Sequence, residues 1–191
     1  MGFPCIGHEY VFEYWKSLRE DGELVPLKSR FRPERFPHPE LLPLICLIEF
    51  TAPGEARMRL NGTAMRDRYG YESKGINFLS LFSDEAKPQT EAFLRRICTF
   101  PYVQLARIEL HRSRAPDIVT RSESLLCPLR FENGDNPLLL TCEIGLDDDF
   151  MADVRSKGAN VDRIRVLSRS FVDIGAGTPD PDLTVLPAGS G

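Results

Sequence analysis

The sequence lacks the features that identify membrane and secreted proteins. No stretch approaches the ~18 consecutive apolar residues that a membrane-spanning helix requires, and the most apolar segment, residues 41–50, is interrupted by Pro43. The N-terminal residues contain no basic flank followed by an apolar stretch, so no secretory signal is expected. We therefore expect a cytoplasmic protein without a membrane partner.

Residues that would support metal binding or catalysis are also scarce. The cysteines are widely spaced and form neither a C-x-x-C pair nor a cluster with histidine: Cys5, Cys46, Cys98, Cys127 and Cys142. None of the three histidines lies beside a G-x-S-x-G element, and no glycine-rich phosphate loop occurs. The acidic run at 147–149 is interpreted as a solvated strand end. The sequence thus predicts no metal site and no catalytic residues, and the cysteines are expected to be buried or partly buried structural thiols.

A basic balance of charge is absent too. Lysine and arginine number 24 against 28 aspartates and glutamates, whereas nucleic-acid-binding proteins usually present a basic face. We therefore expect no nucleic-acid partner. The 191 residues, 42% of them hydrophobic, suffice for one domain with a substantial core.

The first pattern that is present predicts an amphipathic helix at residues 8–21. Its apolar residues recur at helical spacing and include the only tryptophan: Tyr10, Val11, Tyr14, Trp15 and Leu18. Such a stripe must be buried, either against the rest of the domain or against a second copy of the chain, and both alternatives remain open.

The patterns that follow alternate between strand and helix. Five prolines between 22 and 43 predict an irregular connection, and strands are expected at 43–50 and 56–61. Thr63 is expected to cap a short helix that ends at Gly70, and a longer helix is expected from Pro88 to Cys98. Three further strands are predicted at 102–111, 120–131 and 137–146, with Pro128 favouring an edge position or a bulge.

The pattern weakens beyond residue 147. Residues 161–173 are compatible with one more strand or a short helix, and the glycine- and proline-rich residues 176–191 predict a disordered tail. We therefore expect a domain at 8–150, with its core at about 41–146, followed by a C-terminal extension at 151–175.

Three segments carry a resemblance to a known family. Trp15 is followed by Arg19, the first strand is preceded by Leu41-Leu42-Pro43, and the second strand continues as RMRLNGTAMRDRYGYESKGINFLSLF, residues 57–82. The order and spacing of these motifs over residues 8–146 resemble a bacterial family of short proteins that consist of little more than one PAS domain. The matching positions of the long segment are Arg57, Arg59, Leu60, Gly62, Thr63, Gly70, Gly75 and Phe82. Asn61, where an apolar residue is expected, and the region from Arg155 onward depart from the pattern.

The resemblance implies a fold class and a set of pocket residues. PAS domains are α+β proteins with a five-stranded antiparallel sheet and helices packed on one face around a pocket; here an amphipathic helix would precede it. The implied pocket residues are Leu60, Asn61, Thr63, Phe78, Phe82, Phe93, Ile97 and Arg107. Simple filling of the core by these side chains is an equally open alternative.

The sequence lacks the motifs by which PAS domains that bind flavin or haem are recognised. Flavin photosensors of this fold resemble G-x-N-C-R-F-L, whereas residues 75–79, GINFL, lack both the cysteine and the arginine. A haem sensor needs an axial ligand such as a histidine on the long helix, and residues 88–98 contain none. The sequence therefore argues against a flavin–cysteinyl adduct and against haem, and it leaves the ligand unspecified.

The resemblance implies a non-catalytic sensory or regulatory domain. Such a domain would bind a small ligand or a protein partner and transmit the change through its sheet or N-terminal helix, as a homodimer. Because no kinase, cyclase or DNA-binding portion is recognised, the output is expected to pass through a regulatory protein partner. Two alternatives remain: a small enzyme that uses a pocket carboxylate such as Glu109 or Asp67 as a proton carrier, and a ligand-free interaction module.

Overall fold

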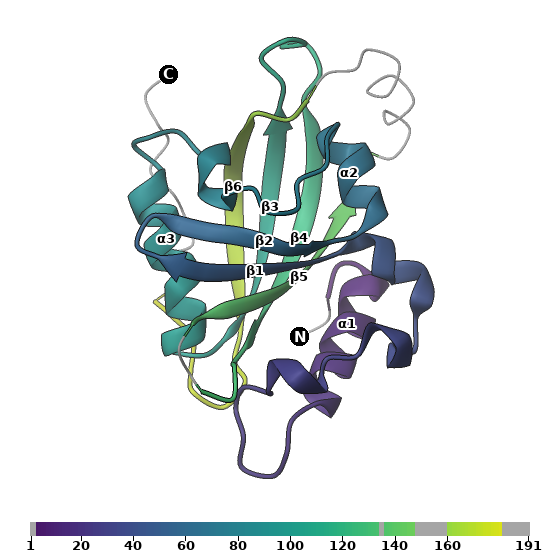
Figure 1. The fold of residues 1–191 in the computed structure, drawn as a ribbon, viewed down its shortest axis with the longest axis vertical. Coiled ribbons are helices and arrows are strands. Elements are labelled where there is room, and N and C mark those ends of the chain that lie inside the picture. Colours follow the sequence, from purple (N-terminus) through teal and green to yellow (C-terminus); the bar gives the residue numbers. More distant parts are fainter. Residues whose placement is uncertain (1–2, 134–135, 148–159, 181–191) are drawn as a thin grey trace.

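The computed structural model describes residues 3–133, 136–147 and 160–180, which form a strongly twisted antiparallel sheet with helices on both faces (Figure 1). The α-helices are α1 (Ile6–Ser17), α2 (Thr63–Tyr69) and α3 (Lys87–Thr99). Short 3-10 helices are η1 (Lys28–Arg30), η2 (Pro33–Arg35), η3 (Pro39–Leu44) and η4 (Phe78–Leu81). The strands are β1 (Ile45–Ala52), β2 (Glu55–Asn61), β3 (Val103–His111), β4 (Thr120–Leu129), β5 (Leu138–Gly145) and β6 (Arg163–Val172).

The strands lie in the order β2-β1-β5-β4-β3-β6, and all neighbours are antiparallel. In Figure 1, β1 and β2 cross steeply over β3, β4 and β6. The α+β architecture expected from the sequence is present, with six strands instead of five. The additional strand, β6, pairs with β3 from Val103 to His111. This pairing satisfies the N–H and C=O groups that the edge of β3 would otherwise expose, which explains why residues 163–172 form a strand and not a helix.

Apolar side chains fill both faces of the sheet. One layer packs the sheet against α2, η4 and α3 and includes Met65, Leu79 and Ile97. The other packs the opposite face against α1 and includes Val11 and Trp15. The helices that follow β2 therefore share one face, as expected, and the N-terminal helix covers the other.

Pro128 lies in an interior strand, and the edge position predicted from its missing N–H is wrong. β4 lies between β5 and β3, and Pro128 pairs with Leu139 of β5. The ladder between β4 and β3 ends at Leu126, so no β3 residue is paired with Pro128. Its carbonyl instead accepts a 2.7 Å hydrogen bond from Trp15 Nε1 of α1. The absent donor therefore costs no ladder bond to β3.

The change from strand to helix after β2 occurs at a glycine that has no room for a side chain. A Cβ at Gly62 would lie 2.1 Å from the carbonyl oxygen of Pro43, while the Gly62 N–H donates to the Ile45 carbonyl at 2.8 Å. Gly62, not Thr63, is the N-cap of α2, and no side chain caps the helix. Gly70 ends α2 with a φ of 84°, which is the left-handed conformation that its position predicted.

Some sequence predictions concern other parts of the chain. Most of the tail predicted at 176–191, and Asp148 and Asp149 of the acidic run, lie outside the described residues. The first acid of that run, Asp147, accepts a 2.8 Å hydrogen bond from the Arg121 N–H. None of the helices within the described ranges has the length and apolar character needed to cross a bilayer.

Candidate functional site

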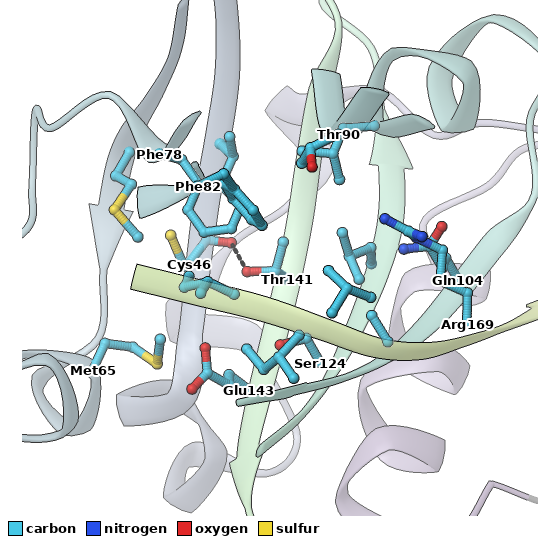
Figure 2. Close-up of a pocket in the computed structure, with 18 of the residues that line it drawn as sticks. Cys46, Met65, Phe78, Phe82, Thr90, Gln104, Ser124, Thr141, Glu143 and Arg169 are labelled. Carbon is cyan, nitrogen blue, oxygen red and sulfur yellow. Dashed lines mark hydrogen bonds between the residues drawn. The ribbon is translucent and has the colours of Figure 1, made fainter. Parts of the chain in front are cut away.

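A cavity of about 50 Å³ lies between the sheet and the layer of α2, η4 and α3 (Figure 2). Every strand contributes to it. Its lining residues are Cys46, Ile48, Met58, Met65, Tyr69, Phe78, Phe82, Thr90, Leu94, Gln104, Ala106, Ile108, Ser124, Leu126, Thr141, Glu143, Ile164, Val166 and Arg169. The wall is therefore mainly apolar, with a few polar groups inserted into it.

Strand alternation explains how a largely apolar sheet brings polar side chains to this cavity. Successive side chains of a strand face opposite sides of the sheet. The cavity receives alternate residues of the three central strands: Gln104, Ala106 and Ile108 of β3, Ser124 and Leu126 of β4, and Thr141 and Glu143 of β5. The intervening Leu105, Leu125 and Cys142 belong to the layer under α1.

One part of the cavity contains a carboxylate whose charge is balanced within the protein. Glu143 accepts hydrogen bonds from the Tyr69 hydroxyl at 3.0 Å and from Arg68 Nη1 at 3.3 Å, and all three residues are buried. Burial, together with the Glu143 charge, raises the pKa of Tyr69 well above its usual range, so the hydroxyl stays protonated and remains a donor. Glu143 therefore needs no further partner.

Arg169 and Gln104 lie side by side in another part of the cavity, apart from Met65 and Glu143 (Figure 2). Arg169 is 6% exposed and Gln104 is 2% exposed. Within the described part of the chain, Nε and Nη1 of Arg169 and Oε1 of Gln104 have no hydrogen-bond partner. Burial lowers the pKa of Arg169 from 12.5 to about 10, so the guanidinium is still protonated at neutral pH. This part of the cavity therefore carries a positive charge without a neighbouring carboxylate.

The cysteine that reaches the cavity is a poor nucleophile. Burial raises the pKa of the Cys46 thiol to about 12, so the thiolate is scarce at neutral pH. Cys127 and Cys142 are likewise buried, whereas Cys5 and Cys98 are partly exposed. The expectation of buried or partly buried thiols therefore holds for all five cysteines.

Four of the predicted pocket residues come from the helical side. Phe78 and Phe82 line the cavity, and their rings pack edge to face with centroids 5.3 Å apart. Phe93 and Ile97 of α3 do not line it. Ile97 is fully buried in the apolar layer, whereas the Phe93 ring lies under Arg169, with the guanidinium carbon 4.3 Å from the ring centroid.

Leu60 lies on the opposite face of the sheet, in the layer under α1, so its predicted place in the pocket is wrong. A bulge in β2 is the cause. Leu47 pairs with Leu60 and Ile48 pairs with Met58, which leaves Arg59 as an extra residue without a partner. The bulge reverses the facing of the strand, and Met58 takes the cavity position.

The three polar residues predicted for the pocket also lie elsewhere. Asn61 donates from Nδ2 to Ser73 Oγ and thereby holds the connector after α2. Thr63 is exposed at the start of α2. Ala106 and Ile108, the neighbours of Arg107 in β3, face the cavity, so Arg107 faces the opposite side of the sheet. There its Nε donates a 3.0 Å hydrogen bond to Glu123. None of the three lines the cavity.

The apolar stripe of α1 packs mainly against the sheet. Val11, Tyr14 and Trp15 are buried, and Leu18 is partly buried in the same layer. Tyr10 is 37% exposed. Of the two alternatives for this stripe, burial within the domain is the one that the structure shows for its central residues.

The two carboxylates considered for an enzyme are not at the cavity. Glu109 lies on the outer face of β3, where it is 3.5 Å from Arg121 and 3.7 Å from Arg165. Asp67 lies on α2, 3.9 Å from Arg66. Neither lines the cavity, so the enzyme alternative loses the proton carriers on which it was based.

Sequence reasoning missed the buried polar residues Gln104, Thr141, Glu143 and Arg169. The sequence could have indicated the first three, because each is a polar residue within a nearly continuous apolar run. Thr141 and Glu143, for example, lie on either side of Cys142. A polar side chain between buried apolar ones normally has a partner or a function. Arg169 gave no such signal, since β6 alternates charged and apolar residues like an ordinary surface strand.

Comparisons with known proteins bear on the fold. A family model described as a PAS domain matches residues 6–143. No curated protein matches the chain. Among solved structures, the LOV protein of Rhodobacter sphaeroides is 17% identical with a TM-score of 0.41, over 53% of this chain and 58% of that one. An RNA-binding light-oxygen-voltage receptor is 19% identical with a TM-score of 0.41, over 60% of this chain and 31% of that one. The chain therefore spans less than two thirds of the length of either structure.

Proposed function

The chain belongs to the PAS domain family, and from that premise we propose that it is a sensory or regulatory domain that binds a small molecule in the cavity. Occupation of the cavity alters the elements around it and thereby alters contacts with a regulatory protein partner. In this function the domain catalyses no reaction. The protein acts in the cytoplasm and binds neither nucleic acid nor membranes.

The observation that carries the proposal is a set of buried polar atoms that face the cavity without a partner. Protein interiors are close-packed, and roughly 90% or more of their buried polar groups are hydrogen-bonded. Arg169 and Gln104 depart from this rule at the same place. A bound molecule that accepts from Arg169, together with a donor to Gln104 Oε1 from that molecule or from a water molecule, accounts for both departures.

The volume of the cavity limits the size of the molecule. A water molecule needs roughly 10–15 Å³ of such space, so about 50 Å³ corresponds to about four water molecules. Drug-sized ligands occupy pockets of roughly 300–1,000 Å³. The volume therefore supports a ligand of a few non-hydrogen atoms, and it does not fit the ring system of a flavin or a haem.

Two residues of the cavity wall also reach the protein surface, where a partner could sense a change in the cavity. Phe78 of η4 and Val166 of β6 line the cavity and are only partly buried. Apolar side chains are exposed on β6, at Leu167, and, on the other face of the sheet, on α1, at Ile6 and Tyr10. We assign partner binding, including homodimer formation, to these exposed apolar side chains.

Thermal unfolding with a panel of small compounds tests the ligand proposal. The panel contains neutral, anionic and cationic molecules of about three to six non-hydrogen atoms. At least one class should raise the melting temperature of the wild type, and Ser124→Leu, which fills the cavity, should abolish the rise. Ser168→Leu on the exposed side of β6 is the matched control and should retain it. If no compound stabilises the wild type, the ligand-dependent function fails and a ligand-free interaction module takes its place.

Light scattering over a range of protein concentrations tests the homodimer separately. A mass that rises from one to two chains with concentration supports it. A mass of one chain at every concentration removes the homodimer and leaves contact with a different protein.

A further inference from the structure

Among the described residues that line the cavity, Arg169 is the only cation. It lies on β6, opposite Ala106 of β3, and its side chain is on the cavity side of the sheet. The exposed Arg165 of the same strand faces the other side of the sheet, and its Nη1 lies 3.7 Å from Glu109. Arg169 therefore differs from its neighbours in burial and in the lack of a counter-ion.

The contact of Arg169 with Phe93 leaves the donors on two of its three side-chain nitrogens unused. The Phe93 ring lies 4.3 Å from the guanidinium carbon and interacts with the cation through its π-face. The N–H groups of a guanidinium lie in its plane, and those on Nε and Nη1 have no acceptor within the described residues. An aromatic ring cannot accept all of these hydrogens, so the edge of the guanidinium is free to bind an acceptor from the cavity.

Gln104 adds a second polar group at the same place. Ala106 pairs with Arg169 and Gln104 pairs with Phe171, so Gln104 and Arg169 are diagonal neighbours on one face of two paired strands. Figure 2 shows their side chains together. The two N–H donors of the Gln104 amide can bind an acceptor beside the guanidinium, whereas its oxygen, which lacks a partner, requires a separate donor such as a water molecule.

We propose that Arg169 and Gln104 bind the carboxylate of a small organic anion whose apolar part lies against the surrounding aliphatic and aromatic side chains. This inference rests on the proposed ligand-binding function and names the chemical class of the ligand. A carboxylate accepts two parallel N–H bonds from a guanidinium, which matches its planar edge. The volume permits about four to six non-hydrogen atoms, as in acetate, propionate or pyruvate.

The charge distribution in the cavity favours an anion over a cation or a zwitterion. Glu143 is the only acid that lines the cavity in the part of the chain that the structure describes, and Arg68 and Tyr69 already donate to its oxygens. A ligand ammonium group would therefore find no free carboxylate there. A doubly charged phosphate would need more donors than one arginine and one amide provide.

Titration of the ¹⁵N-labelled full-length protein with sodium propionate tests the inference. Propionamide is the neutral analogue of equal size, propylammonium is the cationic one, and inorganic phosphate is the alternative anion. Propionate should shift the backbone amides of Gln104, Ala106 and Arg169 and should bind at least about tenfold more tightly than the other three. Arg169→Gln should weaken propionate binding at least about tenfold, and the control Arg165→Gln should leave it unchanged within about twofold.

A second variant covers the case in which Arg169→Gln does not fold. Gln104→Leu keeps the cation, removes the amide, and should weaken propionate binding by about threefold to tenfold. The inference is overturned if Arg169→Gln binds propionate as the wild type does, or if propionamide shifts the cavity amides and propionate does not. The second result leaves a ligand-binding cavity in place, whereas the absence of any shift from all four probes removes both this inference and the ligand-dependent function.

Discussion

Trp15 of α1 donates a 2.7 Å hydrogen bond through Nε1 to the carbonyl of Pro128 in β4. The bond joins the only tryptophan of the chain, which is fully buried, to a strand residue that has no partner in β3. It satisfies the indole N–H and a strand carbonyl at the same time. The N-terminal helix is thereby attached to the interior of the sheet at a defined position.

Replacing Trp15 by phenylalanine should therefore destabilise the domain. The variant leaves the Pro128 carbonyl unpaired and a small void behind it, with an expected loss of about 1–3 kcal/mol. Urea denaturation followed by far-ultraviolet circular dichroism measures the loss. Tyr10→Phe on the exposed side of α1 is the control and should change stability by less than about 0.5 kcal/mol. Equal stability of both variants and the wild type would show that the hydrogen bond contributes nothing.

Gly62→Ala should destabilise the domain through a steric clash. The new Cβ would lie 2.1 Å from the Pro43 carbonyl oxygen, which is a backbone atom, and a Cβ has no rotamer that avoids it, so one backbone segment must move. Gly54→Ala is the matched control, because Gly54 has a φ of 76° but nothing within 4 Å of the added Cβ. The control should lose about 1 kcal/mol through strain alone, and Gly62→Ala should lose more than about 2 kcal/mol. Similar losses for the two variants would refute the close approach to Pro43.

Stability should fall on acidification because of His8. This residue of α1 is fully buried against the sheet, 3.4 Å from Glu123, and burial lowers its pKa below the ordinary 6.5 although the Glu123 charge opposes the shift. Below about pH 6.5 the unfolded chain binds a proton that the native state does not, so the free energy of unfolding decreases as the pH falls toward the native pKa. Urea denaturation at about pH 7.5 and about pH 5.5 measures the difference.

Two variants separate His8 from the other titrating groups. His8→Gln should reduce the loss of stability on acidification, and His38→Gln in the peripheral η3 region should retain the loss seen in the wild type. A loss that is the same in all three proteins would exclude His8 as its source.

Arg169→Met should stabilise the ligand-free protein. Desolvation lowers the pKa of Arg169 to about 10, which means that burial of the charged guanidinium costs folding free energy. At neutral pH the guanidinium is charged in both the native and the unfolded state, so the full cost applies. The cost falls only when the pH rises through the native pKa and the buried group loses its proton. After subtraction of the contact with Phe93, removal of the charge should raise the free energy of unfolding by about 1–2 kcal/mol. Arg165→Met, whose parent side chain is 60% exposed, should change it by less than about 0.5 kcal/mol. Destabilisation by Arg169→Met would show that the charge has an internal partner.

The sequence allowed the order of the elements to be predicted because hydrophobic periodicity and glycine positions are local signals. The long helix was expected at Pro88 to Cys98 and is Lys87–Thr99, and Gly70 ends the short helix as expected. These features depend on residues close together in the chain, so the periodicity rules apply directly.

The facing of the strands could not be predicted in the same way. β3 is apolar on both faces, so its sequence does not show whether Gln104 or Arg107 faces the cavity. In β2 the facing of Leu60 depends on a bulge opposite β1, and a bulge is a property of two paired strands. The correct lining residues therefore required the register between segments that are distant in sequence.

Three residues of the cavity wall, Ile164, Val166 and Arg169, belong to β6, which begins after the last residue matched by the family model, residue 143. The five strands β1 to β5 and the positive charge of the cavity, on Arg169, thus come from separate stretches of the chain. Substitutions confined to one edge strand can change the charge presented to a ligand while the other five strands keep their pairing. Under the proposed function, ligand preference can therefore diverge, or be redesigned, without revision of the fold.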